Sequence, residues 1–207
     1  EPALRAIWPP RPGFSSTLCT IVPVGMLRNG SALPGLMSAA GPDSTTAAMI
    51  WRGWPIEKLL LFFAGHVEGG RPADDQHDLP ITIPVATQLP HAVGLAYAAQ
   101  YRGDDVVVMA YFGDGATSEG DFHAAMNFAG VMKPPIVLFC QNNQWAISTP
   151  GDKQTASETI ALKALAYGIE PLRADGNDVF AVHEVVRYAV DKARRGDGPT
   201  FIELLTY

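Results

Sequence analysis

Cysteine, positive charge and long apolar runs are all scarce in this chain of 207 residues. Its two cysteines cannot frame a fold, which excludes a disulfide-stapled scaffold. The longest apolar stretches, at 59–65 and 106–112, fall far short of the about 20 residues that span a bilayer. Residues 1–8 lack the pattern of a signal peptide. We therefore expect no membrane partner and a cytoplasmic location, or an organellar matrix if the source is eukaryotic.

Lys and Arg together number 15 against 21 acidic residues, which gives a formal net charge of -6. A protein that binds the phosphate backbone usually carries the opposite sign, so we expect no nucleic-acid partner. Hydrophobic residues make up 47% of the chain and no long charge run occurs, which excludes intrinsic disorder. The length is enough for one sizeable hydrophobic core.

The composition changes along the chain. Residues 1–48 are rich in Pro, Gly, Ser and Thr, and Gly30–Thr46 is predicted to form turns and irregular chain. Behind Pro55, a helical stripe of apolar residues follows at Ile56, Leu59, Leu60 and Phe63. We therefore expect an irregular N-terminal segment, 1–48, and an α/β domain over 49–207.

From residue 89 onward, strand and helix patterns alternate. The predicted elements are a helix from Pro90, a strand at 106–112, a helix from a Ser118–Asp121 capping box to 131, a strand at 136–140, a helix from a Thr155–Glu158 capping box to about 167, a short strand near 172, a helix capped by Asp178 and a strand at 200–206. Such alternation predicts a doubly wound, mostly parallel sheet with helices on both faces.

Two of these predicted strands run into unusual polar sequences. The strand at 106–112 leads directly into Gly113-Asp114-Gly115-Ala116, and the strand at 136–140 leads into Gln141-Asn142-Asn143-Gln144-Trp145. In open parallel sheets, ligands bind beyond the carboxyl ends of the strands. We expect these two ends to lie side by side if the strands are neighbours in the sheet.

The residues at these ends suit a magnesium diphosphate. The Asp114 carboxylate and the Asn143 amide oxygen are the hard donors that Mg²⁺ prefers. Gly113 and Gly115 allow a phosphate to approach the backbone closely, and a helix that opens after Ala116 directs free N–H groups to the same place. A lone Gly-Asp-Gly is usually a turn and a lone Asn-Asn usually a loop, but the pair at consecutive strand ends is far more specific.

These sequences resemble a known family. Twenty-six residues separate Gly115 from Asn142, which matches the thiamine diphosphate fingerprint. The strings GDGATSEGDFHAAMNFAGV at 113–131 and QNNQWAIST at 141–149 resemble the alpha subunit of the pyruvate and branched-chain 2-oxo acid dehydrogenases. The resemblance runs from about Met49 to Tyr207 and includes PVATQLPHAVGLAYA and DGNDVFAV.

The resemblance implies a thiamine diphosphate-binding fold that lacks its C-terminal part here, and it implies roles for particular residues. Mg²⁺ would be bound by the side chains of Asp114 and Asn143 and the backbone carbonyl of Trp145. The residues implied for the cofactor itself are Gly113, Asp114, Gly115, Ala116, Gln141, Asn143 and Val85. Pro84, Thr87 and Gln88 match positions with which some relatives hold a potassium ion, but Ile83 replaces a serine there.

The resemblance also implies an activity and partners. The activity is oxidative decarboxylation of a 2-oxo acid, pyruvate or branched-chain, with reductive acyl transfer to a lipoyl group. The partners are a beta subunit, in an alpha-2 beta-2 heterotetramer, and a lipoyl acyltransferase core. The beta subunit supplies the glutamate that activates the cofactor, so no catalytic residue is assigned to this chain. The flanking strings disfavour a thiamine enzyme of the transketolase or carboligase type.

Two departures from the family pattern leave an alternative open. Asp43 and Ser44 stand where the family has a Tyr-Arg pair that contacts the diphosphate. An aspartate there would repel the phosphate, whereas an arginine forms charge-assisted bonds with it. Relatives also continue beyond the position of Tyr207 into a loop that carries histidines. The alternative is a catalytically incompetent fragment or remnant that keeps the fold and binds partners. For His123, polar packing competes with a functional role.

Overall fold

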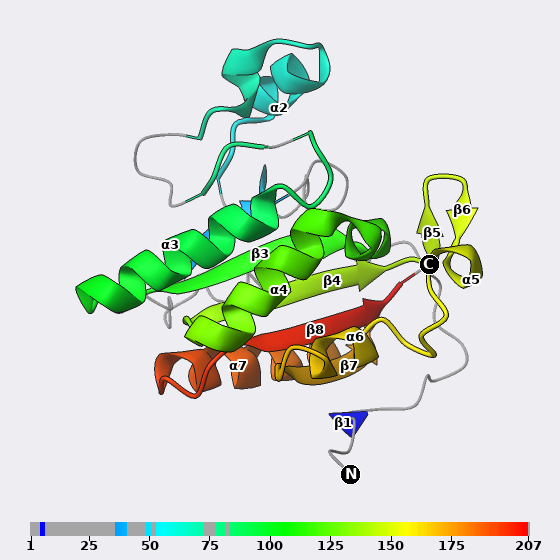
Figure 1. Ribbon diagram of the computed structural model, residues 1–207. Coiled ribbons are helices and arrows are strands. Elements are labelled where there is room, and N and C mark those ends of the chain that lie inside the picture. Colours follow the sequence, from blue (N-terminus) through cyan, green and yellow to red (C-terminus); the bar gives the residue numbers. More distant parts are fainter. Residues whose placement is uncertain are drawn as a thin grey trace.

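The computed structural model describes residues 5–6, 36–40, 49–50, 53–72, 78–81 and 83–206. Its central element is a six-stranded sheet (Figure 1). The six strands are β1 (Arg5–Ala6), β2 (Leu36–Ala40), β3 (Val107–Gly113), β4 (Ile136–Asn142), β7 (Glu170–Asp175) and β8 (Thr200–Leu205). They lie in the order β1-β7-β8-β4-β3-β2, and every pair is parallel, as predicted.

Helices connect and cover these strands, and a small hairpin follows β4. The helical elements are α2 (Ile56–Phe63), η2 (Val67–Gly70), α3 (Gln88–Arg102), η3 (Asp114–Ser118), α4 (Gly120–Met132), α5 (Gly151–Gln154), α6 (Leu162–Leu165) and α7 (Val179–Arg194). The hairpin pairs β5 (Trp145–Ala146) with β6 (Thr149–Pro150). Among the described helices, none combines the length and the apolar character needed to cross a membrane.

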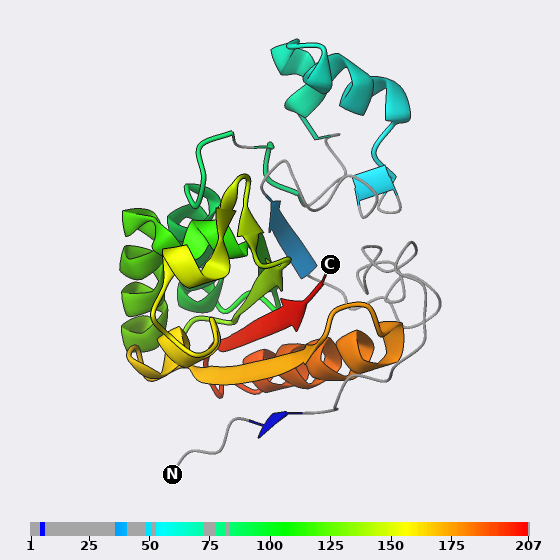
Figure 2. The same cartoon turned by 90° about the vertical axis from the view of Figure 1, so that its right-hand side faces the viewer.

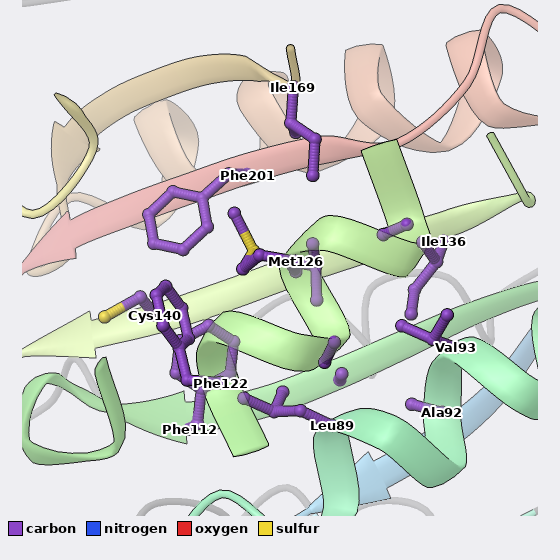
Figure 3. Close-up of a cluster of buried hydrophobic side chains, with 14 of the residues drawn as sticks. Leu89, Ala92, Val93, Phe112, Phe122, Met126, Ile136, Cys140, Ile169 and Phe201 are labelled. Carbon is purple, nitrogen blue, oxygen red and sulfur yellow. The ribbon is translucent and has the colours of Figure 1, made fainter. Parts of the chain in front are cut away.

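The helices lie on both faces of the sheet, which confirms the doubly wound α/β prediction (Figure 2). On one face, α3 and α4 pack against alternate residues of β3 and β4, and Phe112, Phe122 and Phe201 meet there with ring centroids 6.0 to 6.2 Å apart (Figure 3). On the other face, α7 packs against the intervening residues, such as Met109 and Phe139. Because β3 and β4 are buried on both sides, most of the sequence of each reads as a continuous apolar run.

Of the three predicted side-chain caps, one forms and two do not. The Asp178 side chain caps α7, accepting from the backbone N–H groups of Phe180 (2.9 Å) and Ala181 (3.2 Å). The Ser118–Asp121 capping box does not form, since α4 begins one residue later with no side-chain cap. The Thr155–Glu158 box is also wrong, because no helix runs from there to 167 and only Leu162–Leu165 is helical.

The reason for this second error is a local competition for backbone N–H groups. The Thr155 hydroxyl accepts from the N–H of Ser157 at 3.2 Å, a turn that short polar side chains favour over a helix. Farther along, the N–H of Ala161 donates to the carboxylate of Glu203, which is remote in sequence. The segment 155–161 is therefore held by tertiary contacts at the carboxyl edge of the sheet.

One further expectation needs correction, and the place of α2 is a finding of the structure. Within the segment expected to be irregular, Leu36–Ala40 forms a strand that pairs with β3 from Val107 to Tyr111. The apolar stripe of α2 does not face a core, since of the four residues only Leu59 is buried. Asp43 and Ser44 lie outside the described residues, and the division of the chain at residue 48 stays a prediction.

Candidate functional site

The two polar strand ends lie side by side, as predicted. β3 and β4 are adjacent, and their pairing continues to Gly113 opposite Gln141. The β3–α4–β4 connection lies on one face of the sheet and β7–α7–β8 on the other, so the direction of winding reverses between β4 and β8. Such a switch point opens a crevice at the carboxyl edge, which is where ligands bind in folds of this kind.

Asp114 is the first residue of η3 and is only 3% exposed. Its Oδ2 atom accepts from Gln154 Nε2 at 2.9 Å, and its backbone carbonyl accepts from the Thr117 hydroxyl at 2.7 Å. Gln154 also donates to the backbone carbonyl of Thr149 at 3.2 Å. The carboxylate is therefore held in place by both its own turn and the hairpin region that follows β4.

Lys163 holds the turn that contains Asp114 by two hydrogen bonds to Thr117. Lys163 Nζ donates to the backbone carbonyl of Thr117 at 3.0 Å and to its hydroxyl at 2.9 Å. Burial lowers the pKa of Lys163, while the nearby thiol of Cys140 and the carboxylate of Asp114 act in the opposite direction. Burial, with Glu203 and Asp114 close by, raises the pKa of the Cys140 thiol well above 9.0, so Cys140 is a neutral core residue.

The Asn-Asn sequence forms a tight turn at the end of β4. Asn142 Oδ1 accepts from the N–H of Gln144 at 2.8 Å, and Asn143 Oδ1 accepts from the N–H of Trp145 at 3.0 Å. Gln144 has a φ of 68°, a left-handed conformation that a residue with a side chain adopts at a cost. The turn leaves Asn143 exposed and Trp145 half exposed, at 54%.

Gly115 brings η3 against the hairpin. A Cβ atom at this glycine would lie 2.8 Å from Ala146 Cβ and 3.5 Å from Ala146 Cα. Only a residue without a side chain therefore fits between the two segments. This contact places the turn that contains Asp114 next to β5, the strand that begins at Trp145.

A cavity of about 570 Å³ opens at this edge of the sheet. Asp114 and Trp145 both line it, as do Asn142, Arg173 and Glu203. Among the lining residues that the structure describes, Arg173 is the one lysine or arginine, and the other charged ones are carboxylates. The volume is in the range of small-molecule and cofactor sites.

The structure thus brings some of the sequence-predicted residues together and not others. Gly113, Gly115 and Ala116 belong to the same turn as Asp114, but they do not line the cavity. Asn143 does not line it either, whereas its neighbour Asn142 does. Val85, on the turn before α3, is 56% exposed and is not a lining residue.

Gln141 is not a lining residue of the cavity, and the donors around Asp114 suit a hard cation. Gln141 is 8% exposed, and within the described part of the chain its Oε1 atom is buried without a hydrogen-bond partner. Among the described residues, no group of three or more His, Cys, Asp or Glu could hold a metal ion. A cation bound beside Asp114 would need amide, carbonyl, water or phosphate oxygens, and Mg²⁺ accepts such a set.

Four residues of the site were missed in the sequence. Gln154, Lys163 and Arg173 carry no sequence signal, since each reaches the site only through tertiary packing. Glu203 does carry one, because an ionisable residue in the apolar strand TFIELL is unusual and needs a buried partner. His123, in contrast, pairs through Nδ1 with the Tyr167 hydroxyl at 2.6 Å, which fits polar packing.

Known structures and sequences place this arrangement in a class. A solved structure from Mycobacterium smegmatis, assigned as a thiamin diphosphate-dependent enzyme, matches with a TM-score of 0.56 over 83% of this chain and 28% of that chain, at 21% identity. This likeness shows a shared α/β fold.

The sequence identifies the family. Residues 45–207 match the model of the family described as dehydrogenase E1 component, and the chain belongs to this family. It is 49% identical over 156 residues to a 3-methyl-2-oxobutanoate dehydrogenase subunit alpha from Mycobacterium tuberculosis, covering 75% of this chain and 42% of that protein. It is 43% identical over 159 residues to a pyruvate dehydrogenase E1 component subunit alpha from Staphylococcus aureus, covering 77% and 43%. The chain therefore spans less than half the length of these relatives.

Proposed function

We propose that this chain is the cofactor-binding part of the alpha subunit of a 2-oxo acid dehydrogenase, and that it binds thiamine diphosphate with Mg²⁺. The observation that carries the proposal is the position of Asp114. This buried carboxylate lies at the switch-point edge of the sheet, in a turn that Gly115 packs against the hairpin, and it lines a cavity large enough for a cofactor. Membership of the dehydrogenase E1 component family supports the same function.

The residues present fit such a group. Asp114 would supply the one charged ligand to Mg²⁺, and Asn143 and the Trp145 carbonyl would supply neutral oxygens. Gly115 and Ala116 would direct backbone N–H groups to the diphosphate, a contact that a bulkier residue than Gly115 would prevent. The chemistry that thiamine diphosphate supplies, when bound, is stabilisation of the negative charge that develops as a 2-oxo acid loses carbon dioxide.

The proposal includes a partner subunit, and α2 supports it. The apolar residues of α2 and η2 that are exposed by 45% or more are Ile56, Leu60, Leu61, Phe63 and Val67. Exposed apolar groups that gather on one short segment mark interaction sites more often than chance exposure does. We infer that a second subunit, of the beta type, covers this segment and contributes the acid that activates the cofactor.

Titration calorimetry tests the proposal. Thiamine diphosphate is titrated into the chain with and without Mg²⁺, and the titration is repeated on Asp114→Asn, which keeps the shape of the side chain. Saturable binding that needs Mg²⁺ and is lost in Asp114→Asn is expected. Asp152→Asn is the matched control, because Asp152 lines the same cavity with a side chain that is 72% exposed.

The outcomes separate the parts of the proposal. If Asp114→Asn binds as tightly as the unaltered chain, Asp114 is not a ligand and the assignment of the site is wrong. If the unaltered chain does not bind the cofactor even with a beta subunit present, cofactor binding is refuted while family membership stands. The chain alone is expected to turn over no 2-oxo acid, since the activating acid belongs to the partner.

A further inference from the structure

A buried carboxylate lies behind the candidate metal site. Glu203, on β8, has no exposed surface, and it sits on the same face of the sheet as Phe201. In the sheet it is level with Cys140 of β4 on one side and Arg173 of β7 on the other. Charged residues are almost never fully buried unless they are paired, so this carboxylate needs partners.

In the described part of the chain, the groups that pair with this carboxylate are hydrogen-bond donors or cations. Asn142 Nδ2 donates to Oε1 at 2.7 Å, and the N–H of Ala161 donates to Oε2 at 2.8 Å. Arg173 Nε forms an ion pair with Oε2 at 3.6 Å. An ionised carboxylate is an acceptor at both oxygens, whereas a glutamine would direct its NH₂ group at one of these donors.

The bond to Asn142 links Glu203 to the turn that follows β4. With its Nδ2 committed to Glu203, Asn142 has its amide orientation fixed, and its Oδ1 accepts from the N–H of Gln144. That bond holds Gln144 in its left-handed conformation, with a φ of 68°. Asn143 and Trp145, the predicted Mg²⁺ ligands, lie on either side of Gln144.

We propose that Glu203 is a positioning residue for the metal site: through Asn142 it fixes the turn that presents the Asn143 amide and the Trp145 carbonyl to Mg²⁺. The inference rests on the proposed function, since it takes these two residues as ligands. Residues that orient metal ligands are needed for tight binding, and their loss typically weakens metal affinity by about 10- to 100-fold. Glu203 touches neither metal nor substrate in this role.

Glu203→Gln is the first variant to test. This variant removes the charge and places the glutamine NH₂ group against a hydrogen-bond donor, either Asn142 Nδ2 or the N–H of Ala161. The turn that follows β4 should therefore become less well held. The first readout is the amide hydrogen exchange of Gln144 and Trp145 in the chain without cofactor, measured relative to the core strand residue Phe139. The second is the Mg²⁺ affinity at saturating thiamine diphosphate, for which we expect a loss of about 10-fold or more.

A double variant that exchanges the acid and the amide should restore the hydrogen bond between positions 203 and 142. In the double variant Glu203→Gln with Asn142→Asp, the glutamine can accept from Ala161 and donate to the new aspartate, whose other oxygen still accepts from Gln144. The double variant should recover slow exchange at Gln144 and most of the Mg²⁺ affinity. Glu170→Gln is the control. Glu170 is the first residue of β7, away from the carboxyl edge of the sheet, and it accepts a hydrogen bond from the Tyr188 hydroxyl and forms an ion pair with Lys192.

Each outcome decides the inference. Fast exchange and weak Mg²⁺ binding in Glu203→Gln, both reversed in the double variant, support it. Loss of unfolding free energy with unchanged exchange at Gln144 and unchanged Mg²⁺ affinity would overturn it and leave a packing role. If Glu203→Gln does not fold, Asn142→Ala, which breaks the same link and keeps the buried ion pair, must show the same two effects or the inference fails.

The two readouts also separate this inference from the proposed function. If the unaltered chain binds no cofactor even with a beta subunit present, the proposed cofactor binding fails, and with it the metal-related part of the inference. The exchange at Gln144 still decides whether Glu203 holds the turn. If the unaltered chain binds Mg²⁺ in an Asp114-dependent way and Glu203→Gln binds it equally well, the proposed function stands and the positioning role is wrong.

Discussion

The contact between Gly115 and Ala146 gives a prediction that can be worked out from the structure. Gly115→Ala adds one methyl group between η3 and the hairpin. Gly115 does not have a positive φ, so alanine can adopt its backbone conformation. The effect of the substitution is therefore one of space, because the added Cβ would lie 2.8 Å from Ala146 Cβ.

The magnitude follows from that distance. Carbon atoms pack best at about 3.5–4.0 Å, so the hairpin must move away from η3 by close to 1 Å. Overpacking of this kind typically costs about 1–3 kcal/mol of unfolding free energy. Trp145 precedes Ala146, so its carbonyl moves with the hairpin, and a displacement of about 1 Å at a binding group can cost about 10²-fold in function. We expect both lower stability and much weaker Mg²⁺-dependent binding of thiamine diphosphate.

The assay combines urea unfolding with the calorimetric titration described above. Gly94→Ala is the matched control, because Gly94 lies within α3 and a Cβ there meets nothing within 4 Å. Alanine in a helix interior should raise stability by about 0.5–1 kcal/mol, the opposite sign. The double variant Gly115→Ala with Ala146→Gly moves the methyl group across the contact and should recover most of the lost binding.

The reasoning would be refuted by Gly115→Ala retaining full stability and full cofactor affinity. In that case the hairpin would have to yield freely, and Gly115 would not fix its position. Equal losses in Gly115→Ala and in the double variant would also contradict the steric explanation, since the double variant restores the space. They would indicate that the glycine itself, rather than the gap to Ala146, is needed.

Three further predictions concern the core, a helix end and the outer surface. In a Cys19→Ser background, alkylation of the Cys140 thiol should follow unfolding. Because burial raises the pKa of Cys140 in the native state, the unfolded chain loses the thiol proton at a lower pH than the folded chain does. The free energy of unfolding should therefore fall as the pH rises above 9.0, and it should fall less in Cys140→Ala. Asp178→Ala removes the cap of α7 and should cost about 0.5–2 kcal/mol in urea unfolding, whereas an unchanged midpoint would show that the cap is dispensable. Leu60→Glu changes a side chain that is 65% exposed, so it should alter the free energy of unfolding by less than about 0.5 kcal/mol. It should nevertheless weaken association with a partner subunit, measured by sedimentation. Unaltered association would place the interface elsewhere.

Much of the fold could be predicted because the local patterns are strong. The continuous apolar runs at 106–112 and 136–140 are what strands buried on both faces require, and the structure has strands there, Val107–Gly113 and Ile136–Asn142. Asp178 was identifiable as a cap, since its short carboxylate reaches two N–H groups in the next turn. The two predicted capping boxes do not form, because the same residue types also form turns.

The candidate site was predictable only in part. Asp114 could be singled out because a Gly-Asp-Gly turn at a strand end suits a metal diphosphate, and the register of Gly113 with Gln141 places the two polar ends together. The hydrogen-bonded pairs that hold the site residues in place could not be predicted from short motifs. Gln154 reaches Asp114 from 40 positions away, and Asn142 reaches Glu203 from 61 positions away. No local period or spacing encodes such pairs.

The sequence by itself determined the alternation of strands and helices, the burial of the central strands and the family to which the chain belongs. These depend on hydrophobic periodicity and on motifs within short stretches of chain. Only the tertiary structure decided that the stripe of α2 is exposed, that Leu36–Ala40 joins the sheet and that Glu203, Arg173 and Asn142 meet behind the site. The physical reason is that burial, strand pairing and the partners of a buried charge depend on what folds against a segment, and the sequence of the segment itself does not state this.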